Sequence, residues 1–327
     1  MVHISLPALD VARSRTPHRG NIAVSGLLDI AMLLDKKAAA SDPSPWDGAV
    51  SDNDEAHSGW TIILPFFNER RYIERTLVGL ASQDRAFRLV LVDNGSTDDG
   101  AEVARAACRR LGLSFTLLRE PRPGKVHALA TGLADVRTTF VATCDADTWY
   151  PSDYLSQAAA LLAADDVAAA GAFFVPEDAA DDGAPAMPAR LRLATRLLPR
   201  QCHTGGAGQA FRTAALRQAG GFDPARWNWV LEDHEIMHRV ARIGALGYGP
   251  HFWCAPAARE RNRESIRWTL GERLLYHVTP PGLRDRFFYH FLAGRLRARR
   301  LTSARIRERP FHHLGVSSDA APRPVCG

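Results

Sequence analysis

The sequence is poor in the features that mark membrane-spanning and disulfide-stabilised proteins. No run approaches the roughly 18 consecutive apolar residues of a membrane helix, and the first residues lack a compact apolar signal segment. The five cysteines are odd in number and widely spaced, so they predict neither a disulfide framework nor a C-x-x-C metal site. No internal repeat is visible in the sequence. We therefore expect a cytoplasmic protein with an ordinary buried core.

What the chain does have is a long stretch in which apolar strands alternate with helical patterns. The length of 327 residues, 46% of them hydrophobic, allows one large domain with additions or two smaller ones. Residues 1–58 show no sustained periodicity and predict a poorly ordered arm. The alternation that follows is typical of an α/β fold, a mostly parallel sheet covered by helices on both faces. Strands are expected at 61–66, 88–93, 114–118, 139–144 and 167–174, and helices at 70–82, 99–111, 125–135 and 152–163.

The pattern changes after residue 175. Residues 176–188 have the composition of a surface insertion, and a glycine-rich segment from Gly205 leads into a short strand. A helix from Thr213 and a long helix from about Leu231 to Ile243 follow. From residue 264 the chain is predicted to be helical and basic. We therefore expect an α/β domain over 59–263, with parts 59–175 and 189–263, and a helical basic C-terminal extension over 264–327.

Arginines and aromatic residues crowd the C-terminal extension, although the formal net charge of the chain is only +5. Such a segment can lie on an anionic membrane surface or hold phosphate groups, or it can be the solvated face of a helix. No recognition motif accompanies the charge, so nucleic acid is not an expected partner.

Two carboxylates one residue apart, Asp145 and Asp147, close the apolar run from Thr139 to Cys144. In an extended segment alternate side chains point the same way, so this pair can offer hard oxygen ligands to one divalent cation. An isolated pair of this kind would be read as a solvated loop. Here the runs ending at Phe66 and Asp93 also lead into polar loops, and polar strand ends at one edge of a parallel sheet predict a ligand crevice.

These motifs together resemble the family 2 glycosyltransferases of the GT-A (Rossmann-like) fold, which are inverting enzymes with nucleotide-sugar donors. The resemblance covers roughly residues 60–260. It consists, in order, of Pro65-Phe66-Phe67-Asn68-Glu69, the loop Val92 to Asp98, Gly124-Lys125-Val126-His127-Ala128-Leu129, the D-x-D of Asp145 to Asp147, the glycine-rich segment and Glu232-Asp233.

Two departures from the family pattern matter. Asn94 stands where many relatives have aspartate, so the resemblance assigns the donor-binding carboxylate of this loop to Asp93. The signature of processive members is present only in degenerate form at Glu264 to Trp268, and their membrane helices are absent. Processive polymer synthesis is therefore disfavoured.

The resemblance implies a role for each matching residue. Asp233 would be the general base, and Asp147 with Asp145 would hold Mn²⁺ or Mg²⁺. The implied donor-binding residues are Pro65, Phe67, Glu69, Asp93, Lys125 and Asp145, and the implied acceptor-side residues are Gly205, Gly206 and Glu232. Trp229, just before Glu232, can form an apolar wall for the acceptor or simply pack in the protein. Arg259 and Arg261 follow the last expected strand, in a basic segment that could fold as a lid over the diphosphate. Purely structural roles remain open for several of them: Phe67 can be a core residue, Lys125 a surface lysine, and Glu69 and Asp233 acids at helix N-termini.

The predicted function is therefore transfer of a sugar, with inversion, from a nucleotide-diphosphate donor to an acceptor hydroxyl. A uridine diphosphate sugar is the family's commonest donor, the acceptor would be a carbohydrate or lipid-linked, and the basic tail could hold the protein on the inner face of a membrane. Two alternatives remain: a nucleotidyltransferase of similar sheet architecture, and a non-catalytic scaffold that binds nucleotide-sugars or carbohydrates. Retention of Asp93, Asp145, Asp147 and Asp233 together argues against the scaffold.

Overall fold

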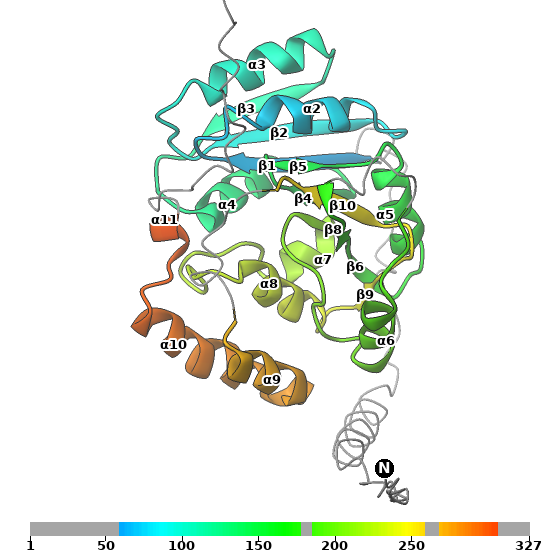
Figure 1. Ribbon diagram of the computed structural model, residues 1–327, viewed down its shortest axis with the longest axis vertical. Helices are drawn as coiled ribbons and strands as arrows, with labels where there is room; N and C mark the ends of the chain where they lie inside the picture. The colour runs from blue at the N-terminus through cyan, green and yellow to red at the C-terminus, as the bar shows by residue number, and fades with distance from the viewer. Residues whose placement is uncertain (1–58, 178–184, 259–267, 307–327) are drawn as a thin grey trace, which may run out of the picture. The chain divides into compact units, whose positions relative to one another are not determined.

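A seven-stranded sheet with the strand order β3-β2-β1-β4-β8-β6-β9 forms the centre of the protein (Figure 1). The computed structural model describes residues 59–177, 185–258 and 268–306. The strands of this sheet are β1 (Trp60–Phe66), β2 (Phe87–Asp93), β3 (Phe115–Arg119), β4 (Phe140–Cys144), β6 (Val167–Gly171), β8 (Gly208–Arg212) and β9 (Ala245–Gly247). Only β8 runs antiparallel to its neighbours β4 and β6, so the sheet is mostly parallel, as expected.

Helices cover both faces of the sheet because side chains alternate along its strands. On one face Ile62 and Leu64 of β1 pack with three helices, α2 (Ile73–Ala81), α3 (Gly100–Arg110) and α5 (Tyr154–Leu162). On the other face Ile63 packs with α4 (Lys125–Asp135), α7 (Thr213–Gln218) and α8 (Glu232–Val240). The result is a three-layer α/β fold, and it confirms the expected fold class.

A second, three-stranded sheet explains where the expected elements were wrong. It consists of β5 (Thr148–Trp149), β10 (Trp253–Pro256) and β7 (Phe173–Phe174). The single strand expected over 167–174 is therefore two strands: β6 stays in the large sheet, whereas Phe173 of β7 pairs with Trp253 of β10. The long helix expected to reach Ile243 ends at Val240, and helix α6 (Ala189–Leu197) was not expected.

The described part of the C-terminal extension is helical, as expected. It contains α9 (Leu270–Val278), η3 (Pro281–Leu283), η4 (Arg286–Leu292), α10 (Ala293–Ala298) and α11 (Ser303–Ile306). These elements form their own core around Trp227, Tyr276 and Phe288. The buried Glu272 of α9 accepts hydrogen bonds from Arg295 and Arg299, which fixes α9 against the chain around α10. None of the described helices is long and apolar enough to cross a membrane. The predicted arm, residues 1–58, lies outside the described residues.

Candidate functional site

Lys125 lies between carboxylates that come from two distant parts of the chain. It is the first residue of α4, and its Nζ lies 2.6 Å from Oδ1 of Asp145, directly after β4, and 3.6 Å from Oε1 of Glu232, the first residue of α8. The chain has only two other lysines, Lys36 and Lys37, and otherwise uses arginine for its positive charge. A compact ammonium group fits between closely spaced carboxylates where a planar guanidinium would not.

The charges of this cluster shift the pKa values of its members in opposite directions. Burial alone would lower the pKa of Lys125, but attraction to Asp145 and Glu232 outweighs it and the pKa is raised. Burial raises the pKa of Glu232, and Lys125 opposes that shift only in part. Burial would also raise the pKa of Asp233, yet His234 and Lys125 together lower it. Asp233 is therefore the more readily ionised of the two adjacent acids.

The two oxygens of Asp233 differ in their surroundings. Its Oδ1 accepts a hydrogen bond from the backbone N–H of His234 at 2.8 Å and lies 3.0 Å from Nδ1 of the same histidine. Its Oδ2 faces the glycine-rich segment, because a Cβ placed on Gly206 would lie 3.5 Å from both Asp233 Oδ2 and Lys125 Nζ. The same Cβ would lie only 3.0 Å from Cβ of Asp233, so a side chain at this position would push against the acid. Gly205 is similarly constrained by the ring of Phe174.

The D-x-D segment is a turn and does not have the extended geometry that we expected. Strand β4 ends at Cys144, and Ala146 and Asp147 form a turn before β5. Hydrogen bonds hold this turn: the Asp145 N–H donates to the Tyr150 hydroxyl at 2.7 Å, and the Thr76 hydroxyl donates to the Ala146 carbonyl at 2.9 Å. The two carboxylates are two residues apart across this short turn, and both contribute, after burial and Cys144, to the raised pKa of the Cys254 thiol.

Asp145 and Asp147 fit a hard divalent cation that arrives with a ligand. Within residues 59–177, 185–258 and 268–306, no group of three or more His, Cys, Asp and Glu side chains could hold a metal ion. Two carboxylates nevertheless supply two of the oxygen ligands that Mg²⁺ or Mn²⁺ prefers, and Mg²⁺ usually takes the rest from phosphate groups and water. The donor set therefore suits a cation bound together with a diphosphate.

The residues expected on the nucleotide side lie in loops that follow β1 and β2. Pro65 is buried in β1 opposite Val92, and Phe67 and Glu69 are half-buried just beyond the strand. Oδ1 of Asp93 accepts the Ser96 N–H at 2.8 Å. The two loops are joined by Asn68, whose Oδ1 accepts the Thr97 N–H at 2.8 Å.

Asn94, which appeared in the sequence only as a departure from the family pattern, connects these loops to Lys125. Its buried side chain donates from Nδ2 to the carbonyls of Glu120 (3.0 Å) and Arg122 (2.8 Å), and its Oδ1 accepts the Gly124 N–H at 2.8 Å. A carboxylate could not donate to two carbonyl oxygens. The amide at this position therefore fixes the loop that begins α4 and places Lys125.

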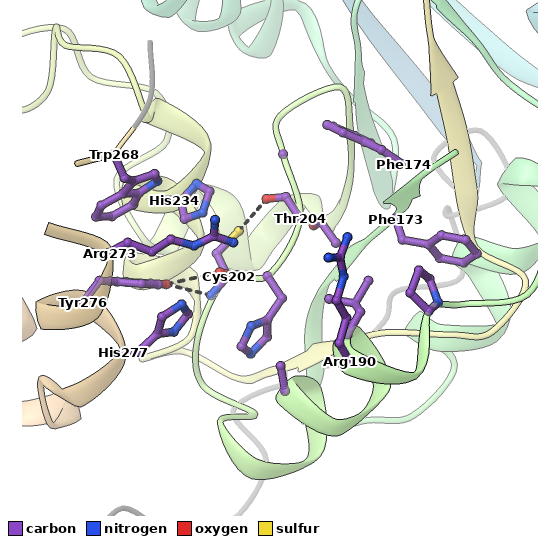
Figure 2. Close-up of a pocket in the computed structure, with 15 residues that line it drawn as sticks. Phe173, Phe174, Arg190, Cys202, Thr204, His234, Trp268, Arg273, Tyr276 and His277 are labelled. Carbon is purple, nitrogen blue, oxygen red and sulfur yellow. Dashed lines mark hydrogen bonds between the residues drawn. The ribbon is translucent and has the colours of Figure 1, made fainter. Parts of the chain in front are cut away.

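A pocket of about 540 Å³ lies beside Asp233, and its walls carry aromatic and basic side chains (Figure 2). Two neighbours of the acid line it: His234, the next residue in the chain, and Gly205, where an added Cβ would lie 3.8 Å from Asp233 Oδ2. Residues of α6 and α9 form part of its wall, among them Arg190, Arg273, Tyr276 and His277. Sequence reasoning missed these residues because no local pattern distinguishes them from the other arginines and histidines of the chain.

Two other expectations for the site have different outcomes. Trp229 does not line this pocket; it forms a bridge with Thr302 and lies under the guanidinium of Arg297, at 5.9 Å, in the C-terminal core. Arg259 and Arg261, the expected lid, lie outside the described residues.

Comparison with known proteins gives a consistent family and fold. The model of the family described as "Glycosyl transferase family 2" matches residues 61–219. An undecaprenyl-phosphate 4-deoxy-4-formamido-L-arabinose transferase of Edwardsiella ictaluri (strain 93-146) is 30% identical over 98 residues, which are 28% of this chain and 30% of that relative. The chain thus spans about a third of the length of the curated relatives it matches.

Two solved structures are similar over most of the chain. The mannosyltransferase PcManGT from Pyrobaculum calidifontis, in complex with GDP-Man and Mn²⁺, has a TM-score of 0.56 and 26% identity, covering 82% of this chain and 79% of that one. S. aureus TarS 1–349, in complex with UDP-GlcNAc, has a TM-score of 0.50 and 20% identity, covering 72% and 71%. The second likeness supports the fold alone.

Proposed function

Residues 61–219 form a family 2 glycosyltransferase domain, and on that premise we propose that the protein transfers a sugar, with inversion, from a nucleoside diphosphate donor to an acceptor hydroxyl. Asp233 is the general base in this proposal. Lys125, Asp145 and Asp147 hold the diphosphate with a divalent cation, and Phe67, Glu69 and Asp93 hold the nucleoside. No observation favours a nucleotidyltransferase or a binding scaffold over this reading.

The position of Lys125 between Asp145 and Glu232 is the observation that carries the proposal. It brings the strand end on the donor side next to the helix that begins with Glu232 and Asp233. Inversion requires a base on one face of the reacting sugar and the departing diphosphate on the other. The cluster supplies a cation for the diphosphate and a carboxylate oxygen, Asp233 Oδ2, that faces the adjoining glycines and can take the proton of the acceptor hydroxyl.

A cation bound by Asp145 and Asp147 would supply positive charge to the departing diphosphate. The similar mannosyltransferase structure contains Mn²⁺ with GDP-Man, which supports Mn²⁺ or Mg²⁺ as the metal. Because that structure contains GDP-Man, guanosine diphosphate sugars should be tested together with the uridine diphosphate sugars that the family resemblance favours. A panel of both, measured by thermal shift with Mn²⁺, identifies the donor because a ligand that binds only the native state raises its melting temperature.

Replacement of Asp233 by asparagine tests the base. Asp233→Asn keeps the size of the side chain and removes the proton acceptor, so the transfer rate should fall by about 10² to 10⁴-fold, while donor affinity stays within about twofold because the donor is held elsewhere. Asp165→Asn, at an exposed carboxylate before β6, is the matched control. Transfer at the wild-type rate by Asp233→Asn would remove the base from the proposal.

Replacement of Asp147 tests the metal site separately from the base. The wild-type protein should bind the nucleotide-sugar more tightly with Mn²⁺ than without it, and Asp147→Asn should abolish that difference because one carboxylate ligand is gone. Isothermal titration with and without Mn²⁺ measures both states. An Mn²⁺ dependence that survives Asp147→Asn would show that the cation is held by other groups.

The surface of the C-terminal helices supports peripheral contact with an anionic membrane. Leu270, Leu274 and Val278 are spaced by four residues on α9, so they share one helix face, and they are 86%, 62% and 46% exposed. Leu283 and Phe291 are also exposed and line one pocket with Val278, and the exposed Arg286 and Arg295 lie near them in the chain. Apolar side chains flanked by arginines are typical of helices that lie in the interface of an anionic bilayer.

Vesicle co-sedimentation decides whether this surface touches a membrane. Vesicles with phosphatidylglycerol should bind the protein more than vesicles of phosphatidylcholine alone, because anionic lipids attract the arginines. The double change Leu270→Asp, Leu274→Asp should weaken binding by about tenfold, whereas Val78→Asp, at an exposed position of α2, should not. Equal binding by all three proteins would refute membrane contact through α9.

A further inference from the structure

The pocket beside Asp233 has an unbalanced set of charges. Among the described residues that line it are two arginines, Arg190 and Arg273, and three histidines, His203, His234 and His277, and none of these described residues is an aspartate or glutamate. Carboxylates lie just outside it, in the Lys125 cluster. A pocket lined by cations without anions is complementary to a ligand that carries negative charge.

The two arginines reach the pocket from opposite walls. Arg190 comes from the first turn of α6 and Arg273 from α9, and Figure 2 shows their guanidinium groups on the two sides of the cavity. Neither forms an ion pair with any residue of the described ranges, in contrast to Arg295 and Arg299 further along, which bind Glu272. Both side chains are therefore available to a ligand, and an arginine can bind a phosphate with two parallel hydrogen bonds.

Two of the histidines, His203 and His277, contribute shape, and the arginines supply charge. Burial lowers the pKa of His203 to about 4, and burial together with Arg273 lowers the pKa of His277. Both rings are accordingly neutral near pH 7. His203 is further fixed by its contact of 2.8 Å with the Leu198 carbonyl.

Hydrogen bonds and ring contacts hold the pocket wall against the candidate base. The Tyr276 hydroxyl accepts the Cys202 N–H at 2.9 Å, and His277 Nδ1 lies 2.9 Å from Oε1 of Gln201. The ring of His234, which is bonded to Asp233, packs against Trp268 and Tyr276 with centroid distances of 5.2 and 5.9 Å. Helix α9 is thereby connected to Asp233 through a short chain of contacts, so a group bound at Arg273 would lie in a fixed position relative to the base.

We propose that this pocket binds the phosphate group of a phosphorylated acceptor, with Arg190 and Arg273 as the residues that hold it. The inference rests on the proposed function, because it treats Asp233 as the base that the acceptor faces. It adds a substrate class to that function: an acceptor that carries a phosphate monoester or diester in addition to the hydroxyl that receives the sugar. The aromatic side chains Phe174, Trp268 and Tyr276 hold the uncharged part of the same molecule.

Binding measurements test the inference without any sugar transfer, so a failure of the proposed catalytic role and a failure of this site give different results. Calorimetry on the full chain would compare citronellyl phosphate with citronellol, and glycerol 3-phosphate with glycerol. Each phosphorylated probe that binds should lose about tenfold in affinity in Arg273→Ala and again in Arg190→Ala, since a hydrogen-bonded charge contact is removed each time. Arg273→Lys should retain part of the affinity.

The probes also distinguish the source of the phosphate. Tighter binding of citronellyl phosphate indicates a lipid phosphate, and equal or tighter binding of glycerol 3-phosphate indicates a soluble or polymeric one; either result supports the inference. Arg192→Ala is the matched control, because Arg192 is exposed on α6 and does not line the pocket. The inference is overturned if neither phosphate binds more tightly than its alcohol, if Arg192→Ala weakens binding as much as Arg273→Ala, or if the arginine variants weaken donor binding instead.

Discussion

The two sides of the site are held together in different ways. On the donor side, the loops at 65–69, 93–98 and 120–124 are bonded to one another by Asn68, Asn94 and Glu120, across separations of 26 to 30 residues. We call these loops the donor rim. On the acceptor side, residues 201–206 are bonded to α9 across 74 to 76 residues, and α6 completes the wall. We call this part the acceptor rim.

The two rims differ in how far short sequence motifs determine their structure. The donor rim follows from three neighbouring parallel strands whose carboxyl ends meet at one edge, so short motifs after each strand suffice to build it. The acceptor rim has no such rule, because its parts are brought together only by the packing of the C-terminal core around Tyr276 and Phe288. A family resemblance can therefore define the donor rim closely while the acceptor rim varies with the individual protein.

Lys125 connects the two rims, and among the changes that compare the rims its replacement should have the largest effect. Lys125→Met leaves the carboxylates of Asp145, Glu232 and Asp233 without their shared cation, so we expect transfer to fall by about 100-fold or more, as for the loss of other charge-stabilising groups in active sites. Steady-state kinetics and donor titration measure the effect.

Lys125→Arg is the control for charge. A guanidinium keeps the charge but is too broad and planar for the space beside Gly206, so it should restore only part of the activity. Full activity in Lys125→Met would mean that the two rims act without this residue and that the contact at 2.6 Å is only structural.

Asn94 tests the donor rim alone. Asn94→Asp replaces an amide that donates to two carbonyls by a carboxylate that repels them, so the protein should lose about 2 kcal/mol of stability, the cost of an unsatisfied buried polar group. Chemical denaturation measures it. Asn68→Asp is the matched control, since the oxygen of Asn68 that accepts the Thr97 N–H is retained by aspartate, and the bond it would lose, from Nδ2 to the Thr97 hydroxyl, is exposed. Equal stability of the two variants would contradict the role of Asn94.

Tyr276 tests the acceptor rim alone. Tyr276→Phe removes the hydroxyl that accepts the Cys202 N–H, so we expect a loss of about 1 kcal/mol of stability and a higher KM for the acceptor. The KM for the donor should not change, because the donor rim has no contact with this side chain. A parallel rise of both KM values would show that the rims are not independent.

The sequence predicted the fold and the donor side more completely than the acceptor side, for physical reasons that particular residues show. The predicted helix at 125–135 has the bounds of α4, and the strands at 61–66 and 88–93 differ from β1 and β2 by one residue. Short continuous apolar runs in the strands, a helical apolar spacing in α4 and glycine-containing loops between them give these elements local signals. Strands β5, β9 and β10 have only two to four residues each, too few for a period to appear.

For the site residues, too, those with local sequence motifs were predicted and those placed by the tertiary fold were not. Lys125, Asp145, Glu232 and Asp233 were predicted together and do lie together, whereas Asn94 was noted only as a departure and Arg190 and Arg273 were not predicted. The role of Asn94 depends on carbonyl groups of another loop, and that of the arginines on helices that only the tertiary fold places opposite each other. The bend at Asp147 was also missed, because the turn is held by Thr76 and Tyr150, which are far away or outside the motif.

The smallest expected effect concerns the pH dependence of the donor rim. The side chain of Arg122 donates hydrogen bonds to Glu120, and this lowers the pKa of that carboxyl from its usual 4.5 to about 2. Because the folded protein has the lower pKa, the ionised carboxylate stabilises it above pH 4.5, and this contribution is lost as the pH falls from 4.5 toward 2. Glu120→Gln should therefore lower the melting temperature at pH 7 and have progressively less effect below pH 4.5. Melting temperatures of both proteins across this range measure the difference, and a difference that stays constant with pH would show that Glu120 acts through its shape alone. Acceptor binding depends on the acceptor rim, so its pH dependence should be the same in the wild-type protein and in Glu120→Gln.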